Sequence, residues 1–157
     1  MALLMRSRKV CEQERCAPLP DNGVSARRLS YTAALESWDQ QAILGALADD
    51  VVIYVAVDDA PMSGKQVAEF FFGVLEEELG AMVVTDEIIE DNNAVVLFET
   101  AISDTSAQGM NVVRLDDSGS IRELTVLFRP LRALALIAGV VGARMSERFG
   151  SPPQVRD

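Results

Sequence analysis

Hydrophobic and polar positions follow two different periods along the chain, and the changes of period predict its elements. Apolar residues recur at helical spacing from Leu29 to Leu47, which predicts one long helix or two short helices broken near Asp39. The run VVIYVAV at 51–57 is β-branched and apolar, and predicts a strand buried on both faces. A second amphipathic helix is expected next, with apolar positions at Val67, Phe70, Phe71, Val74 and Leu75.

The second half of the chain predicts an antiparallel meander followed by a helix. Segments with strand character lie at 82–90, 94–103, 109–116 and 120–129. Asp116-Asp117-Ser118-Gly119, between the last two, is the clearest hairpin turn in the chain. Pro130 ends the last strand and suits the first turn of a helix, expected over 131–147. Helices first and a meander afterwards indicate an α+β fold rather than a wound parallel sheet.

The length of 157 residues corresponds to one domain with a real hydrophobic core. We expect this domain to span 24–147, between a flexible basic leader over 1–23 and a disordered tail over 148–157. Residues 1–30 hold six Lys or Arg against three acids, so the rest of the chain has a net charge of −13 and the whole chain −10. Such an acidic body repels phosphate backbones, and we therefore expect no nucleic-acid partner. The leader is interpreted as a soluble tail, with contact to nucleic acid or anionic lipid as the alternative.

The absence of histidine from the sequence excludes several kinds of chemistry. Ser-His-Asp and Cys-His catalysis and histidine metal sites all need that side chain. Cys11 and Cys16 alone cannot complete a four-ligand zinc site, and we expect them to be reduced thiols, with a redox pair as the alternative. The chain has no Walker loop and no GxGxxG motif, so we predict no cofactor and no metal.

One long apolar stretch needs an explanation other than a membrane span. Residues 133–143 (ALALIAGVVGA) form an apolar run of eleven between two arginines, whereas a span needs about 20 residues. We interpret the run as a helix buried in the core or at a subunit interface, in a cytoplasmic protein without a membrane contact. Together with the apolar strand segment 124–128, it offers more apolar surface than a monomer hides, which predicts a homodimer.

Four phrases in this order resemble the nuclear-transport-factor-two-like superfamily in its SnoaL-like branch, and the last resembles an uncharacterised bacterial subgroup of it. They are Leu35-Glu36-Ser37-Trp38-Asp39 with LADDVV at 47–52, SGKQVAEFF at 63–71, LDDSGSIREL at 115–124, and Phe128-Arg129-Pro130-Leu131. The resemblance implies a cystatin-like cone, in which a curved antiparallel sheet wraps around the N-terminal helices and an apolar pocket. It also implies a homodimer packed through the sheet. Relatives include ketosteroid isomerase, scytalone dehydratase and polyketide cyclases, beside proteins that only bind.

Chemistry in such a cone needs a carboxylate or a phenol made reactive by desolvation. Glu99 is the first candidate catalytic residue, because its strand face also carries Val95 and Leu97. That face of the strand either lines the pocket or is exposed to solvent. Tyr54 is the second candidate, since its phenol donates to an oxyanion if it is not simply packed. The isomerase branch has its general base shortly after the DDVV phrase, and here residues 53–57 contain no carboxylate.

Four further residues are candidate substrate contacts. The Asn111 amide can orient a carbonyl but cannot act as a base, whereas many enzymatic relatives have Asp near this point of the sequence. Tyr31 and Trp38 lie seven residues apart on one helix face, in the core or at the pocket mouth, and Phe71 follows on the second helix.

Two functions remain open from the sequence. The first is the binding of a small apolar molecule, either alone or in an isomerase-, cyclase- or dehydratase-type enzyme of unknown substrate. The alternative is a non-catalytic dimerisation or ligand-sensing module, favoured by the missing histidine and the missing base. The enzyme is favoured if one enclosed cavity is surrounded by Glu99, Asn111 and Tyr54. The non-catalytic module is favoured if apolar side chains fill the interior.

Overall fold

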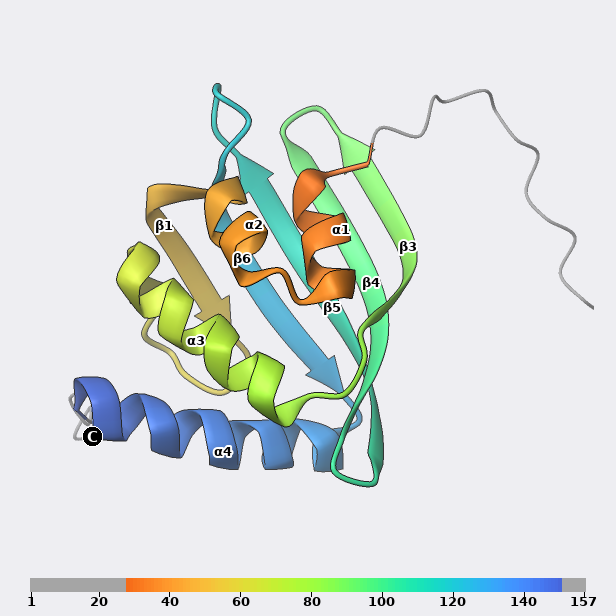
Figure 1. Cartoon of the computed structure of the whole chain (residues 1–157), viewed down its shortest axis with the longest axis vertical. Coiled ribbons are helices and arrows are strands. Elements are labelled where there is room, and N and C mark those ends of the chain that lie inside the picture. The colour runs from red at the N-terminus through yellow and green to blue at the C-terminus, as the bar shows by residue number, and fades with distance from the viewer. Residues whose placement is uncertain (1–27, 151–157) are drawn as a thin grey trace, which may run out of the picture.

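Three helices lie against one face of a six-stranded sheet, and a fourth helix runs across one end of that sheet (Figure 1). The computed structural model describes residues 28–150, so the predicted leader with Cys11 and Cys16, and the part of the predicted tail after Gly150, lie outside the described residues. The elements are α1 (Ser30–Ser37), α2 (Gln40–Ala46), β1 (Leu47–Val55), β2 (Met62–Ser63), α3 (Lys65–Glu78), β3 (Val83–Glu90), β4 (Asn93–Ile102), β5 (Thr105–Leu115), β6 (Ile121–Arg129) and α4 (Leu131–Phe149).

The strand order of the sheet is β2-β1-β6-β5-β4-β3. Strands β3 to β6 form the predicted antiparallel meander, with β4 and β5 paired from Asn93↔Arg114 to Ile102↔Thr105. Strand β1 joins β6 in parallel, a pairing of distant segments that the local pattern does not predict. The α+β class, the curved sheet around the N-terminal helices and the C-terminal helix are confirmed (Figure 1).

The first helical region consists of two short helices that meet near Asp39, which confirms the second of the two alternatives predicted for it. Trp38 ends α1 in the left-handed conformation, with φ at 51°, and thereby turns the chain. The Asp39 carboxylate then accepts a hydrogen bond from the backbone N–H of Ala42 at 3.0 Å and caps α2. The cap satisfies a backbone donor that the helix itself leaves unpaired.

The expectation that the first strand is buried on both faces is wrong. Val51 and Ile53 are buried, but Val52 is only half-buried and Tyr54 is 40% exposed. Side chains of a strand alternate between the two faces of the sheet, and helices α1 to α3 cover a single face. Within residues 28–150, no element covers the opposite face, which is called the outer face below.

The hairpin turn predicted at 116–119 is present between β5 and β6. One carboxylate oxygen of Asp116 accepts hydrogen bonds from the Ser118 N–H at 2.8 Å, the Ser118 hydroxyl at 2.7 Å and the Ser120 N–H at 3.0 Å. These bonds, that of the Ser118 hydroxyl foremost, lower the pKa of Asp116 because they stabilise its charged form. The turn therefore fixes where β6 begins.

Candidate functional site

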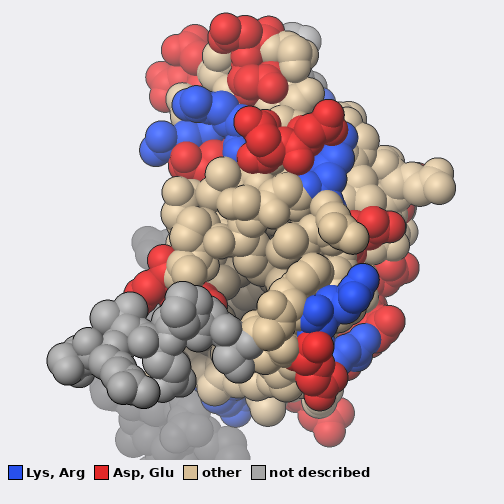
Figure 2. Space-filling model, turned by 90° about the vertical axis from the view of Figure 1, so that its left-hand side faces the viewer, with Lys and Arg blue, Asp and Glu red and all other residues tan. Residues whose placement is uncertain are grey.

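A cavity of about 580 Å³ lies where α4 crosses the end of the sheet. Its walls come from the ends of β1 and β6, from the loop between β1 and β2, from α3 and from α4. Figure 2 shows a hollow in this side of the molecule, within an area of uncharged side chains that charged residues border. Its volume falls within the range of small-molecule sites in proteins.

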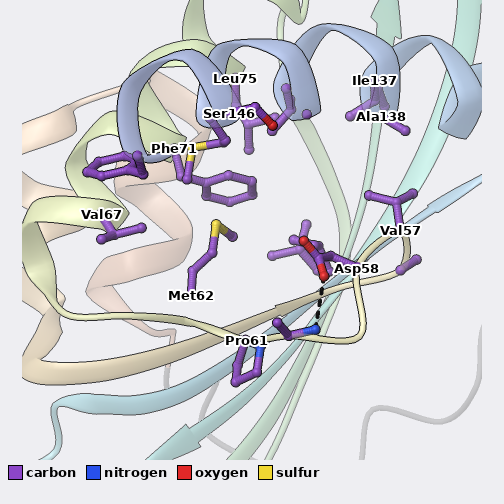
Figure 3. Close-up of a pocket in the computed structure, with 18 of the residues that line it drawn as sticks. Val57, Asp58, Pro61, Met62, Val67, Phe71, Leu75, Ile137, Ala138 and Ser146 are labelled. Atoms are coloured by element: carbon purple, nitrogen blue, oxygen red, sulfur yellow. Dashed lines mark hydrogen bonds between the residues drawn. The ribbon is translucent and has the colours of Figure 1, made fainter. Parts of the chain in front are cut away.

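Two amphipathic helices supply most of the apolar wall. Helix α3 presents Val67, Phe71 and Leu75 to the cavity, which are spaced four residues apart. Helix α4 presents an apolar face with the i, i+3, i+4 pattern of a helix, which includes Leu134, Ile137, Ala138, Val141 and Met145. Figure 3 shows Phe71 from α3 and Met62 from the opposite wall pointing toward one another. The apolar run 133–143 therefore buries its inner face partly in the core and partly around this cavity.

Polar side chains are rare in the cavity wall. Asp58, Ser63 and Ser146 are the polar side chains among the described residues that line it, and none of those residues is Lys or Arg. One carboxylate oxygen of Asp58 accepts a hydrogen bond from the Ala60 N–H at 2.9 Å (Figure 3). This short-range bond fixes the carboxylate at the start of the loop.

The structure brings two of the candidate contacts, Tyr31 and Asn111, together in the core. They are 1% and 2% exposed, and the Asn111 Nδ2 donates a hydrogen bond to the Tyr31 hydroxyl at 3.0 Å. Burial raises the pKa of Tyr31 strongly, so the phenol stays neutral. The Asn111 Oδ1 has no hydrogen-bond partner among residues 28–150, and turning the amide over would leave its nitrogen unpaired there instead.

This buried pair does not reach the cavity. Tyr31 packs edge-on against Phe72 with ring centroids 6.4 Å apart, and Phe72 packs in the same way against Phe71 at 5.4 Å. Phe71 lines the cavity, whereas Tyr31 and Asn111 do not. Trp38 is also outside the cavity: it is half-buried, and its Nε1 lies 3.4 Å from the carbonyl oxygen of Gly80, to which it donates. Phe71 is therefore the one predicted site residue that lines the cavity.

The two candidate catalytic residues, Glu99 and Tyr54, lie on the outer face of the sheet. Glu99 is exposed and accepts a hydrogen bond from the Gln108 Nε2 at 3.0 Å. Its neighbours Phe98 and Thr100 point inward and are buried, so alternation directs Glu99 away from the helices. Glu99, Asn111 and Tyr54 therefore do not converge around one cavity.

Comparisons with known proteins give a fold. No family model matches the sequence, and no curated protein matches it either. An uncharacterised protein with a cystatin-like fold from Silicibacter pomeroyi superposes with a TM-score of 0.70 at 18% identity, over 76% of this chain and 86% of its own. A steroid delta-isomerase from Pseudomonas aeruginosa superposes with a TM-score of 0.68 at 17% identity, over 77% and 90%.

The chain has the nuclear-transport-factor-two-like, or cystatin-like, fold. A protein with a ketosteroid isomerase-like fold from Catenulispora acidiphila, solved with trimethylamine, also superposes on it, with a TM-score of 0.54 at 12% identity over 71% of this chain and 90% of its own. The resemblance inferred from the four sequence phrases is thus confirmed for the fold. Within this cystatin-like fold, the described residues include no helix that is long and apolar enough to cross a membrane.

In this cystatin-like fold, the sequence pattern did not reveal the contributions of Asp58, Ser146 and the inner face of α4 to the cavity. Asp58 is an exposed residue of the loop after β1, and residues 133–143 are predicted from the sequence only as a core or interface helix. The available signal was the apolar spacing at Leu134, Ile137 and Val141, which marks one face of α4. What that face encloses depends on where the helix crosses the sheet.

Proposed function

We propose that the protein binds a small apolar molecule in the cavity between α3, α4 and the β1–β2 loop. The observation that carries this proposal is a volume of about 580 Å³ whose wall contains three polar side chains among otherwise apolar ones. An apolar molecule that enters such a space removes its own surface and that of the wall from water, which favours binding. The neighbours solved with trimethylamine or named as a steroid isomerase support a small molecule as the ligand.

Binding without catalysis fits the site better than a SnoaL-like isomerase, cyclase or dehydratase. Among the described lining residues, Asp58 is the one ionisable side chain. An enzyme of these types moves a proton between two positions and needs a base and an acid at the reacting atoms. Glu99 and Tyr54 lie on the outer face, and Tyr31 with Asn111 lies behind Phe71 and Phe72. We therefore propose that the protein binds or senses a ligand and does not catalyse a reaction on it.

Two glycines of α4 offer a matched test of the cavity as the binding site. Gly142 lines the cavity and Gly139 does not, and a Cβ at either position meets no atom of the described residues within 4 Å. Leucine at either position raises helix stability by about 1 kcal/mol. We expect Gly142→Leu, whose side chain occupies the cavity, to weaken binding of the neutral dye N-phenyl-1-naphthylamine at least tenfold. Gly139→Leu should leave it unchanged, with dye fluorescence as the measurement.

Two results of the dye titration would contradict the proposal. A wild-type protein that does not enhance the fluorescence of the dye would show that the cavity takes no apolar molecule of this size. An equal affinity of the Gly142→Leu variant and the wild type would place the dye outside the cavity.

We also propose that two copies associate through the outer face of the sheet. This face carries half-buried apolar side chains in the centre of the sheet, namely Val95, Leu97, Met110, Val112 and Leu127. An apolar patch of this kind on neighbouring strands is typical of a protein interface. The same face holds Glu99 and Tyr54, and a sheet-to-sheet dimer gives them a structural setting rather than a catalytic one.

The dimer makes a second measurable prediction. Leu97→Glu places a charge at the centre of the outer face, and we expect sedimentation to give the chain mass of 17.0 kDa for this variant and twice that mass for the wild type. Leu136→Glu, on the exposed side of α4, is the control and should stay dimeric. A wild type that sediments as a monomer at micromolar concentration would refute the dimer.

A further inference from the structure

We propose that the molecule in the cavity carries a positive charge beside its apolar part, and that Asp58 receives that charge. This inference rests on the proposed binding function and specifies the class of ligand as an apolar amine or other organic cation. Asp58 is the charged side chain in the described wall, and the other side chains of that wall are apolar or carry a hydroxyl. Asp58 is exposed to solvent at the edge of this apolar wall, and a carboxylate there without a basic neighbour in the described wall attracts a cation from solution.

The position of Asp58 makes the carboxylate available to a ligand. Its hydrogen bond from the Ala60 N–H at 2.9 Å occupies one oxygen and holds the side chain at the loop. Figure 3 shows the carboxylate between the loop and α4, on the inner side of the loop that forms the cavity wall. No ion pair joins Asp58 to any residue within the described part of the chain, so its charge is not compensated there.

The remaining wall orients the ligand. Phe71 and Val67 form the apolar part of the cavity away from Asp58 (Figure 3), so the hydrocarbon of the ligand would extend toward α3. An ammonium at Asp58 would donate hydrogen bonds to the carboxylate, and charge-assisted bonds of this kind are about twice as strong as neutral ones. An anionic ligand would meet repulsion from Asp58 and from a chain of net charge −10.

Asp59 is a control for the effect of net charge, because it follows Asp58 in the sequence and does not line the cavity. Asp58→Asn and Asp59→Asn change the net charge by the same amount, one residue apart. Asparagine also keeps the oxygen that accepts from the Ala60 N–H, so the loop retains its hydrogen bond. Any difference between the two variants therefore reports on the carboxylate in the cavity wall.

Three probes of equal chain length measure the charge preference: decylamine, 1-decanol and decanoate, each kept below its micelle-forming concentration at pH 7. We expect calorimetry or displacement of N-phenyl-1-naphthylamine to give wild-type affinities about tenfold higher for decylamine than for decanol, with decanoate weakest. Asp58→Asn should lower the affinity for decylamine about fivefold and leave decanol unchanged. Asp59→Asn should change neither.

The outcomes separate this inference from the function on which it rests. If decanol and decylamine bind the wild type equally, or if both variants lower decylamine affinity to the same extent, the cavity is an apolar site without a charge subsite, and the inference is overturned while the binding function stands. If none of the three probes binds and the dye also fails, both the inference and the binding function are overturned. A decylamine affinity that only Asp58→Asn lowers supports both.

Discussion

Replacing Gly109 with alanine will destabilise the protein by about 3 kcal/mol, the upper end of the roughly 1–3 kcal/mol that overpacking a tight core typically costs. Gly109 lies on β5 between Phe98 of β4 and Phe128 of β6. A Cβ at this position would lie 2.1 Å from the Phe98 Cζ, far inside van der Waals contact. Urea unfolding followed by circular dichroism measures the loss.

The Phe98 ring has little freedom to move away from the added methyl group. Phe98 is 2% exposed, and its ring packs edge-on against Phe128 with centroids 5.7 Å apart. Relief of the clash therefore displaces the half-buried Phe128 ring or the β5 backbone, and close packing in protein interiors resists both. Glycine is required at this position so that the ring can lie across the strand.

Gly139→Ala is the control for this substitution. Within residues 28–150, a Cβ at Gly139 meets nothing within 4 Å, and the residue lies inside α4, where alanine is the better helix former. We expect a gain of about 1 kcal/mol. A loss below about 1 kcal/mol for Gly109→Ala would mean that the Phe98 ring yields without cost, contrary to the packing described.

The elements of the fold were largely predictable from the sequence because each depends on a local pattern. The spacing from Val67 to Leu75 gives α3, and the Asp116 turn gives the hairpin of β5 and β6. The parallel pairing of β1 with β6 was not predictable in this way, because it joins segments that no short pattern relates. This pairing matters for the proposed binding site, because the ends of these two strands form part of the cavity wall.

Which face of a strand turns inward was the harder question, and β4 shows why. The inward residues Val96 and Phe98 and the outward residues Val95 and Leu97 are all apolar. Alternation alone therefore fixed that Glu99 shares a face with Leu97, but not which face the helices cover. The placement of Glu99 and Tyr54 on the outer face followed only from the position of α1 to α3.

The cavity itself was not predictable from its residues, with the exception of Phe71. Leu134, Ile137 and Val141 mark an apolar face of α4, but the same pattern is typical of a helix packed without any space beneath it. A cavity exists because α4 crosses the end of the sheet at a distance that these side chains do not fill. The loop between β1 and β2 and helix α3, which lie elsewhere in the chain, form much of the remaining wall.

Tyr31→Phe will destabilise the protein by about 2 kcal/mol without changing its affinity for an apolar ligand. The substitution removes the hydroxyl that accepts from the Asn111 Nδ2 in the described part of the chain, and a buried polar group left without a partner costs about 1–3 kcal/mol. Tyr54→Phe, at a tyrosine that is 40% exposed, is the control and should stay within about 0.5 kcal/mol of the wild type. Urea unfolding gives the free energies, and dye titration gives the affinities.

The double variant Tyr31→Phe with Asn111→Leu distinguishes a lost hydrogen bond from lost packing. Leucine has a shape close to that of asparagine, so the pair becomes apolar on both sides and leaves no unpaired polar group. We expect the double variant to be less destabilised than the sum of the two single variants by about 1 kcal/mol or more. Additive effects would show that the two side chains act independently. A dye affinity that falls with Tyr31→Phe would instead connect the buried pair to the cavity through Phe72 and Phe71, and would reopen a role for it in ligand recognition.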